Sequence, residues 1–290
     1  MKRALVAMML VGVLATVAWG YEGVIGFQGG HGAKALGMGG AFCALADDGT
    51  AALWNPAGIA LMGEQAWLGG ATSQLFGLVG YQYVAGGFSF AGYAVGIGWA
   101  NLTAGELYAA NAYLGTVGVK IGDFGTVGVN LKYYSETVDD DTAAGFGFDV
   151  GALLPLTPEI AIGIVAKDVG GTTLAGQTVT PLYGAGMALK LLDGALKLAA
   201  DVELGGMDFA VRDLRTGLEF VLIENLAVRA GVVVPEMDFA GYYFTVGAGF
   251  SLAGLTIDAA YVLMPNPGES LVLSATFTFG ELFAPPAPTE

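Results

Sequence analysis

Two adjacent carboxylates and a thiol lie in one short stretch near the start of the chain. Residues 39–60 read GGAFCALADDGTAALWNPAGIA and contain Cys43, Asp47 and Asp48. Paired carboxylates suggest general acid and base chemistry, and a cysteine thiol can act as a nucleophile. Hydrolysis by two carboxyl groups requires them to stand about 5 Å or more apart on either side of the reacting bond. Asp47 and Asp48 are neighbours in the chain, so the pair is not expected to be catalytic.

Other residues that carry chemistry are sparse. The 290 residues contain one cysteine, Cys43, and one histidine, His31. Ser-His-Asp chemistry and most metal sites need several such groups in one constellation. The glycines form neither a P-loop nor a G-x-G-x-x-G motif after a strand. We therefore expect no catalytic residue, no metal site, no cofactor and no enzymatic activity, and Cys43 is expected to be a small buried apolar residue.

The composition indicates a protein that is surrounded by apolar material. Of the 290 residues, 54% are apolar, 13% are charged and 48 are glycine, and the mean hydropathy is +0.63. A transmembrane helix needs about 18 or more largely apolar residues in a row, and only residues 1–20 approach this. The formal net charge of -15 argues against nucleic acid as a partner, because its phosphates would be repelled.

The first residues have the features of a secretory signal peptide. Lys2 and Arg3 precede an apolar run, and Ala18-Trp19-Gly20 places small residues at both positions that a signal peptidase inspects. We expect cleavage after Gly20 and export of the mature chain. A retained membrane anchor is the less favoured alternative, because the run is short and no stop-transfer pattern follows it.

From residue 64 onward, apolar residues recur at every second position between clusters of Gly, Pro or Asp. This period of two predicts β-strands. In residues 126–134, for example, Val127 and Val129 point one way whereas Gly128 and Asn130 point the other. Fourteen such runs are expected, at residues 65–72, 78–85, 88–100, 110–121, 125–136, 142–154, 159–168, 181–191, 195–204, 213–222, 225–234, 241–252, 254–264 and 269–279.

The length of these runs favours a membrane barrel over a soluble sheet. Most have about 10 to 12 residues, which lets a tilted strand cross an apolar band of roughly 25 Å, whereas soluble strands are nearer five or six. Unpaired edge amides are costly in lipid, so the sheet must close. We predict an all-β fold, a closed antiparallel transmembrane β-barrel of about 14 strands with an N-terminal luminal plug, in the outer membrane of a diderm bacterium. A secreted soluble β protein is the less favoured alternative.

The connections between the runs alternate in length, as expected when one end of a barrel has tight turns and the other has loops. Tight turns are expected at AGG near residue 85, GDFG near 122, PLTP near 155, LLDGA near 191, IEN near 223 and LAG near 252. Longer, acidic loops include ANLTAGELYAAN, ETVDDDT and DVGGTTLAGQTVT. An even number of strands then places both termini on the tight-turn side, in the periplasm.

Directing the apolar face toward lipid places charges of both signs inside the barrel. The expected lumen-facing charges are Lys120, Lys132, Asp149, Lys167, Lys190, Lys197, Asp201, Glu203, Asp213, Arg215, Glu219, Arg229 and Asp258. These charged residues must face inward, because a Lys or Arg facing lipid at the midplane would cost about 2 to 4 kcal/mol. The charges either line a polar path or hold the lumen closed through ion pairs, and for any single residue the second interpretation is favoured.

The early strands have an inner face that is nearly free of side chains, formed by Gly92, Ala94, Gly96, Gly98 and Ala100. Residues 21–63 can fill the space, because this segment is too long for a simple terminus and lacks strand alternation. We expect it to be a plug in which Asp48 or Thr50 caps a short helical turn that Asn55-Pro56 ends.

The plug segment carries a family resemblance. Residues 32–60, GAKALGMGGAFCALADDGTAALWNPAGIA, closely resemble the N-terminal signature of the FadL/PorV-like outer-membrane proteins, which include PorQ. The matching positions are Gly37, Gly39, Gly40, Ala41, Ala46, Asp47, Asp48, Asn55, Pro56 and Ala57. Beyond them, the resemblance rests on barrel architecture and on the terminal LSATFTFG, which looks like a last strand ending in an aromatic assembly signal. It implies a fourteen-stranded barrel with an N-terminal hatch, in agreement with the number of runs.

The resemblance implies two different roles. FadL-type members take up hydrophobic compounds across the outer membrane, whereas PorV-type members hold secreted substrates in type IX protein secretion. This chain has shorter loops than either type and an extra tail, GELFAPPAPTE. We expect passive transport of a hydrophobic small molecule, gated by hatch movement. The alternative is an accessory role in type IX secretion or surface attachment, with secretion-machinery proteins as partners.

The expected organisation is a signal peptide at residues 1–20, a hatch at 21–63, a barrel at 64–279 and a Pro-containing periplasmic tail at 280–290. We expect Asp47 and Asp48 to accept hydrogen bonds from backbone amides or to pair with inward cations such as Lys132 or Arg229. The hatch motif comprises Gly39, Gly40, Asp47, Asp48, Asn55, Pro56 and Ala57.

Overall fold

The computed structural model describes residues 30–75, 78–105, 108–139, 141–174, 176–264 and 269–280. The expected signal peptide, residues 21–29 of the expected hatch and residues 281–290 of the expected tail lie outside the described residues. Within the described part of the chain, no helix has both the length and the apolar character needed to cross a membrane.

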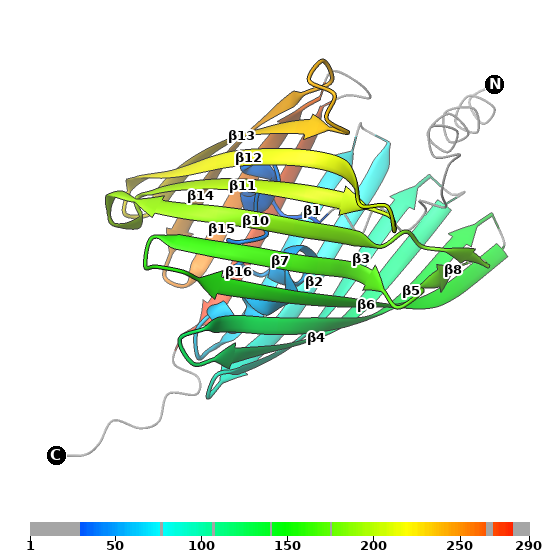
Figure 1. Cartoon of the computed structure of the whole chain (residues 1–290), viewed down its shortest axis with the longest axis horizontal. Helices are drawn as coiled ribbons and strands as arrows, with labels where there is room; N and C mark the ends of the chain where they lie inside the picture. The colour runs from blue at the N-terminus through cyan, green and yellow to red at the C-terminus, as the bar shows by residue number, and fades with distance from the viewer. Residues whose placement is uncertain are drawn as a thin grey trace.

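Fourteen antiparallel strands close into a barrel (Figure 1). Neighbours along the chain pair with each other, and the first strand also pairs with the last, from Ala66 opposite Phe279 to Leu75 opposite Ser270. The predicted closed antiparallel β-barrel is therefore confirmed. Its strands are β1 Ala66–Leu75, β2 Val79–Phe90, β3 Tyr93–Ala104, β4 Tyr108–Ile121, β5 Gly125–Val138, β6 Asp141–Pro155, β7 Ile160–Val169, β10 Leu182–Leu191, β11 Leu196–Gly205, β12 Ala210–Ile223, β13 Leu226–Pro235, β14 Tyr243–Leu252, β15 Leu255–Leu263 and β16 Ser270–Phe279.

Side chains alternate between the two faces of the wall, as a period of two requires. On β5, Val127 and Val129 are exposed on the outer face, whereas Asn130 and Lys132 are buried inside. Large apolar residues such as Ile97 on β3 and Phe146 on β6 are likewise exposed on the outside. The outer wall is thus apolar, which suits an acyl-chain environment.

The prediction of a tight turn near residue 85 is wrong. Strand β2 continues to Phe90, and the turn is formed by Ala91 and Gly92, both with positive φ, which suits a tight hairpin. Gly92 therefore belongs to the turn and not to the inner wall. The glycine at position 87 serves packing, because a Cβ there would lie 2.8 Å from the Trp67 indole.

Two of the longer loops expected from the sequence are also mostly strand. Only residues 105–107 separate β3 from β4, and only residues 139 and 140 separate β5 from β6. The strand ends are small or polar but still pair, as Asn101 does with Asn111 and Thr137 with Thr142. The apolar alternation ends where the apolar band ends, whereas backbone pairing continues beyond it, so pattern alone places the strand ends too early.

The two ends of the barrel differ, and we name them by their connections. The turn end carries short connections such as Ala91–Gly92 and residues 122–124. The loop end carries the short β3–β4 and β5–β6 connections together with longer ones, residues 236–242 between β13 and β14 and the β7–β10 connection. The β7–β10 connection contains a small separate sheet of β8 Thr173–Leu174 and β9 Gln177–Thr178.

Residues 30–63 lie inside the barrel, and we call them the luminal segment (Figure 1). They form three short helical pieces, α3 Ala33–Gly37, α4 Ala51–Trp54 and the 3-10 helix η1 Pro56–Leu61, joined by turns. Helix α3 packs against β13 to β16, and η1 packs against β3 to β6. Most of the segment is buried, so the largest apolar cluster of the molecule lies between this segment and the inner wall.

Candidate functional site

Hydrogen bonds from wall side chains hold the first half of the luminal segment. The Asp201 carboxylate on β11 accepts from the backbone amides of Phe42 and Cys43, each at 2.8 Å, through the same oxygen, Oδ2. Three strands further along the wall, Thr245 Oγ1 on β14 accepts from the Gly39 amide at 2.9 Å. Amides in irregular backbone need such partners when buried, so these side chains fix the path of the segment.

Two further side chains hold the second half. The Asn130 amide on β5 donates to the Ala52 carbonyl at 2.8 Å, and the Lys167 ammonium on β7 donates to the Leu53 carbonyl at 2.8 Å. Both acceptors belong to α4, whose carbonyls have no partner within so short a helix. The inward polar residues of the wall therefore complete the hydrogen bonding of the luminal segment.

The glycines of the motif allow close contact with the wall. Gly39 has a φ of +66°, and a Cβ there would lie 3.0 Å from the Thr216 carbonyl oxygen and 3.1 Å from the Val232 amide nitrogen. Gly40 has a φ of +74°, and a Cβ there would lie 3.1 Å from the Trp54 ring. Any other residue at these positions would strain the backbone and push the segment off the wall.

Asn55 connects the luminal segment to itself and to the wall. It is fully buried, and its Nδ2 group donates to the Cys43 carbonyl at 3.0 Å and to the Ala152 carbonyl of β6 at 3.1 Å. Its Oδ1 accepts from the Ala57 amide at 3.2 Å and thereby caps η1, in which Pro56 is the first residue. The expected helical turn does end at Asn55-Pro56, but a second helical turn follows before the first strand.

The two adjacent aspartates have separate and local roles. Asp48 is buried, and its Oδ1 accepts from the Thr50 amide at 2.8 Å and the Thr50 hydroxyl at 2.7 Å. Asp47, whose side chain is 37% exposed, pairs with Lys34 of α3 at 2.5 Å. The expected backbone acceptor role thus applies to Asp48. The prediction that these aspartates pair with Lys132 or Arg229 is wrong, because both cations bind carboxylates of the wall.

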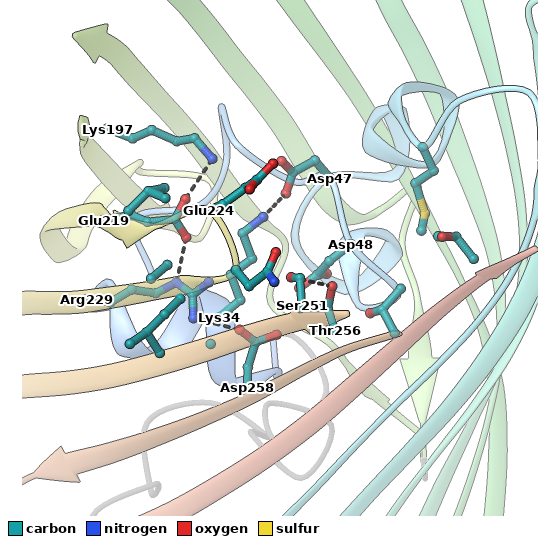
Figure 2. A pocket seen from close by; sticks show the side chains of 18 of the residues that line it. Lys34, Asp47, Asp48, Lys197, Glu219, Glu224, Arg229, Ser251, Thr256 and Asp258 are labelled. Carbon is teal, nitrogen blue, oxygen red and sulfur yellow. Dashed lines mark hydrogen bonds and ion pairs between the residues drawn. The ribbon is translucent and has the colours of Figure 1, made fainter. Parts of the chain in front are cut away.

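A cavity of about 380 Å³ lies between the luminal segment and the turn end of the wall (Figure 2). Lys34 points toward Asp47 on one side, and Glu219 stands between Lys197 and Arg229 on the other. Burial alone would lower the pKa of Lys34, but the carboxylates of Asp47, Glu219 and Asp48 outweigh it and raise that pKa. The cavity is thus a polar space, lined by three basic and five acidic side chains, in which Lys34 stays protonated.

The inward charges form three groups. Lys132 lies between Asp149 at 2.5 Å and Asp168 at 2.8 Å, and all three side chains are buried. Arg229 binds Glu219 at 2.6 Å and Asp258 at 2.7 Å, and Glu219 also binds Lys197 at 2.6 Å. Arg215 binds Asp213 at 2.7 Å and Glu203 at 3.1 Å.

The wall therefore places the expected inward charges in different surroundings. Lys132, Asp149, Asp201, Glu203, Glu219, Arg229, Asp258 and Lys167 are buried, whereas Lys197, Asp213 and Arg215 are half-buried. Lys120 and Lys190 have the inward parity but lie exposed at the turn end. The interior charges that have described partners bind one another or the luminal segment, so they stabilise a filled lumen.

Asp168 is a site residue that the sequence did not indicate. It follows the inward Lys167 and would point outward in a regular strand. The pairing of β6 with β7 shifts register between Phe148 and Val150, and Asp168 has a φ of +51°, so it too faces the interior. There it accepts from the Tyr134 hydroxyl at 2.9 Å. A β-bulge of this kind turns one side chain to the other face of the sheet and leaves the alternation of the surrounding apolar residues unchanged.

Aromatic rings fill the lumen beside the early strands. The Trp67 ring lies against Gly96 and the Tyr83 ring against Gly98, where a Cβ would lie 3.3 Å from each ring. His31 stacks on Tyr81 with ring centroids 3.5 Å apart. The small residues of β3 therefore make room for rings of β1 and β2, and the expected filling by the luminal segment applies instead to Gly118 on β4, which contacts Ile59 and Ala60.

Two remaining sequence expectations concern Cys43 and metals. Cys43 is buried, as expected, and burial together with the nearby Asp201 carboxylate raises the pKa of its thiol. A protonated, buried thiol is unreactive. In the part of the chain that the structure describes, no group of three or more His, Cys, Asp or Glu side chains has the arrangement of a metal site.

The anchoring role of Asp201 predicts a difference between two substitutions. Asp201→Ala leaves the buried Cys43 amide without an acceptor and the Phe42 amide with only its bond to the Gly40 carbonyl, and should destabilise the luminal segment by about 2 kcal/mol. Asp201→Asn keeps one carbonyl acceptor and should cost less than half as much. Hydrogen exchange of the amides of residues 42 and 43 measures both. Equal exchange in the two variants would contradict the assignment.

Several solved structures share this fold. The toluene transporter TbuX of Ralstonia pickettii superimposes with a TM-score of 0.60 at 13% identity, over 87% of this chain and 98% of that chain. The toluene transporter TodX of Pseudomonas putida gives a TM-score of 0.66 at 10% identity, over 86% and 98%. A FadL homologue of Pseudomonas aeruginosa gives 0.62 at 13% identity, over 86% and 98%.

No protein-family model matches the chain, and neither does any curated protein. The comparisons support the FadL part of the sequence resemblance at the level of fold and give no support to the PorV/PorQ part. At identities of 10% to 13%, similarity of structure establishes architecture. The chain therefore forms a closed barrel of fourteen strands and shares its fold with two toluene transporters and a FadL homologue.

Proposed function

We propose that this protein is an outer-membrane transporter that carries a small hydrophobic molecule passively across the membrane. One observation carries the proposal: a closed barrel with an apolar outer wall holds a buried luminal segment, in a fold shared with barrels described as toluene transporters. The secretion alternative has no supporting observation and is not proposed.

The inner surface supports a hydrophobic cargo on one side of the lumen. The buried side chains contributed by β1 to β4 include Trp67, Tyr81, Tyr83 and Leu114. The ion pairs lie on the rest of the wall, on β5 to β7 and β11 to β15, and Lys132 on β5 pairs in register with Leu114 on β4. An apolar molecule can contact the aromatic strands without breaking ion pairs. On the strands that carry the ion pairs, it would have to displace paired charges.

The proposal also assigns roles to the parts of the chain. Residues 1–20 act as a cleaved signal peptide, and residues 21–63 act as a hatch held by the motif residues Gly39, Gly40, Asp48 and Asn55. The turn end faces the periplasm, and residues 280–290 form a periplasmic tail. Lipid surrounds the apolar outer wall, and no nucleic acid or cofactor takes part.

Uptake by whole cells tests the proposal. Cells that lack their own hydrophobic-compound channel should accumulate radiolabelled toluene or palmitate several-fold faster when they express this protein than with an empty vector. Lys120→Met, at the exposed turn end, is the matched control and should leave the rate unchanged. A rate equal to that of the empty vector for both compounds, with folded barrel present in the outer membrane, would reject transport of these classes.

Deletion of residues 21–63 tests the hatch separately. Removing a hatch should raise the passage of small polar solutes as well as of hydrophobic ones, because the lumen would then be open. Conductance of the purified barrel in planar bilayers measures this, and the temperature at which the barrel loses its compact mobility on a denaturing gel shows whether it still folds. An unchanged conductance in a folded deletion variant would count against a hatch.

A further inference from the structure

The β7–β10 connection turns back over the barrel interior at the loop end. We call residues 172–174 and 176–179 the inner hairpin, in which Thr173 pairs with Thr178 and Leu174 with Gln177. The Val179 amide donates to the Thr172 carbonyl at 2.9 Å and closes the base of the hairpin. Leu174 and Val179 are each 1% exposed, although they belong to a connection and not to the wall. The hairpin therefore inserts two aliphatic side chains into the molecule.

Its position on the wall is defined by Gly145 on β6. A Cβ added to Gly145 would lie 2.1 Å from the Thr173 carbonyl oxygen and 3.6 Å from Leu174 Cδ1. Gly145 faces inward, in the same parity as Asp149 and Gly151, so the hairpin rests on the inner face of the wall (Figure 1). Leu174 and Val179 join the buried cluster that also contains Leu114, Tyr83 and Tyr134. The hairpin thus packs on β6 at the loop end and adds two aliphatic side chains to this cluster.

The hairpin and the luminal segment are held in different ways. The luminal segment is fixed by charged and amide groups such as Asp201 and Asn55, whose removal would leave buried polar atoms unpaired. The buried side chains of Leu174 and Val179 make apolar contacts, which an apolar molecule of similar size can replace. Gly170 and Gly171, which lead into the hairpin, have positive φ and no atom within 4 Å of a built Cβ, so nothing packs against them. The hairpin can therefore swing outward at lower cost than the luminal segment.

We propose that the inner hairpin is the entrance gate of the lumen, and that the apolar site filled by Leu174 and Val179 receives a small uncharged hydrophobic molecule when the hairpin withdraws. This inference rests on the proposed function and adds to it the place and the chemistry of the first binding step. The hairpin competes with the cargo for one apolar site, so it occupies that site when no cargo is present.

Gly145→Ala acts as a wedge, because the added methyl group cannot coexist with the Thr173 carbonyl in its present place. Gly115→Ala on β4 is the matched control, since no atom lies within 4 Å of a built Cβ there. Both are made in a Cys43→Ala, Leu174→Cys background and labelled with a water-soluble maleimide. The wedge should speed labelling at position 174 by about tenfold, as expected for a local opening, and Gly115→Ala should not. A cysteine at the exposed Thr173 should label quickly in both.

Uptake of toluene by cells is measured with the same wedge and control in the native-cysteine background. Faster labelling together with faster toluene uptake supports the gate. Unchanged labelling overturns it whatever the uptake, and so does faster labelling with unchanged uptake when the parent protein transports toluene.

Failure of the proposed function gives a separate result. If the parent takes up no more toluene than the vector, the gate is judged by labelling in the presence of toluene. Accelerated labelling of Leu174→Cys, without acceleration at Thr173→Cys, supports an apolar site under the hairpin. No acceleration overturns it.

Discussion

Replacing Lys132 by Met should destabilise the barrel by about 3 to 5 kcal/mol, because two carboxylates would remain buried without a cation. Lys132 lies 2.5 Å from Asp149 and 2.8 Å from Asp168, and the three side chains are at most 5% exposed. Asp149 also accepts from Asn130, which holds the α4 carbonyl of Ala52, so the loss should extend to the luminal segment. The midpoint of urea unfolding of the lipid-embedded barrel measures the change.

Two further variants separate charge from packing. Lys120→Met removes an exposed lysine of the neighbouring strand and should change stability by less than about 0.5 kcal/mol. Adding Asp149→Asn and Asp168→Asn to Lys132→Met removes the uncompensated charge and should restore more than half of the loss. A Lys132→Met variant as stable as the native protein would show that the cluster is not a structural ion pair.

Acidification should release the start of the luminal segment through His31. Its Nδ1 atom lies 3.0 Å from the Gly30 carbonyl and donates to it. The lowered pKa keeps the ring neutral near pH 7, so Nε2 then accepts from the Ser73 hydroxyl at 2.8 Å. Burial lowers the pKa of His31 to about 4, against the opposing hydrogen bond to Gly30. In the unfolded segment the pKa is about 6.5.

The sign of the effect follows from these two values. Above about pH 6.5 both states are neutral and the segment has its full stability. As the pH falls from about 6.5 to about 4, only the unfolded state takes up the proton, and about 3 kcal/mol of local stability is lost. Below about pH 4 both states are protonated and the loss no longer grows.

Hydrogen exchange of residues 31–36 in native protein and in His31→Gln measures this at each pH. Glutamine can still bond to Gly30 and Ser73 but has no charge to gain, so the difference between the two proteins should vary only within this window. Burial raises the pKa of Asp48, which acts in the opposite direction, but it is common to both proteins and cancels. A difference that is constant from pH 7 to pH 4 would contradict the assignment.

Predictions from the sequence succeeded where one local pattern was enough. The alternation of Val127 and Val129 with Asn130 and Lys132 gives the two faces of β5. The lack of strand alternation in residues 21–63 predicted a non-strand segment, and its described part forms short helical pieces and turns, although η1 follows Asn55 where the first strand was expected. The prediction of a turn near residue 85 failed because Gly86 and Gly87 have the composition of a turn but lie in strand β2, where Gly87 packs against the Trp67 ring.

The sequence by itself determined the number of strands, the apolar outer wall and a charged interior, because each follows from the two-residue period of a pleated strand. Only the tertiary structure decided which charges meet. Asp47 forms an ion pair with Lys34 inside the luminal segment. Asp168 forms one with Lys132 because a β-bulge turns its side chain inward. It also decided that the β7–β10 connection folds inward over Gly145. These contacts depend on the stagger of the strands and the path of the luminal segment, which join residues far apart in the chain and leave no periodic trace in it.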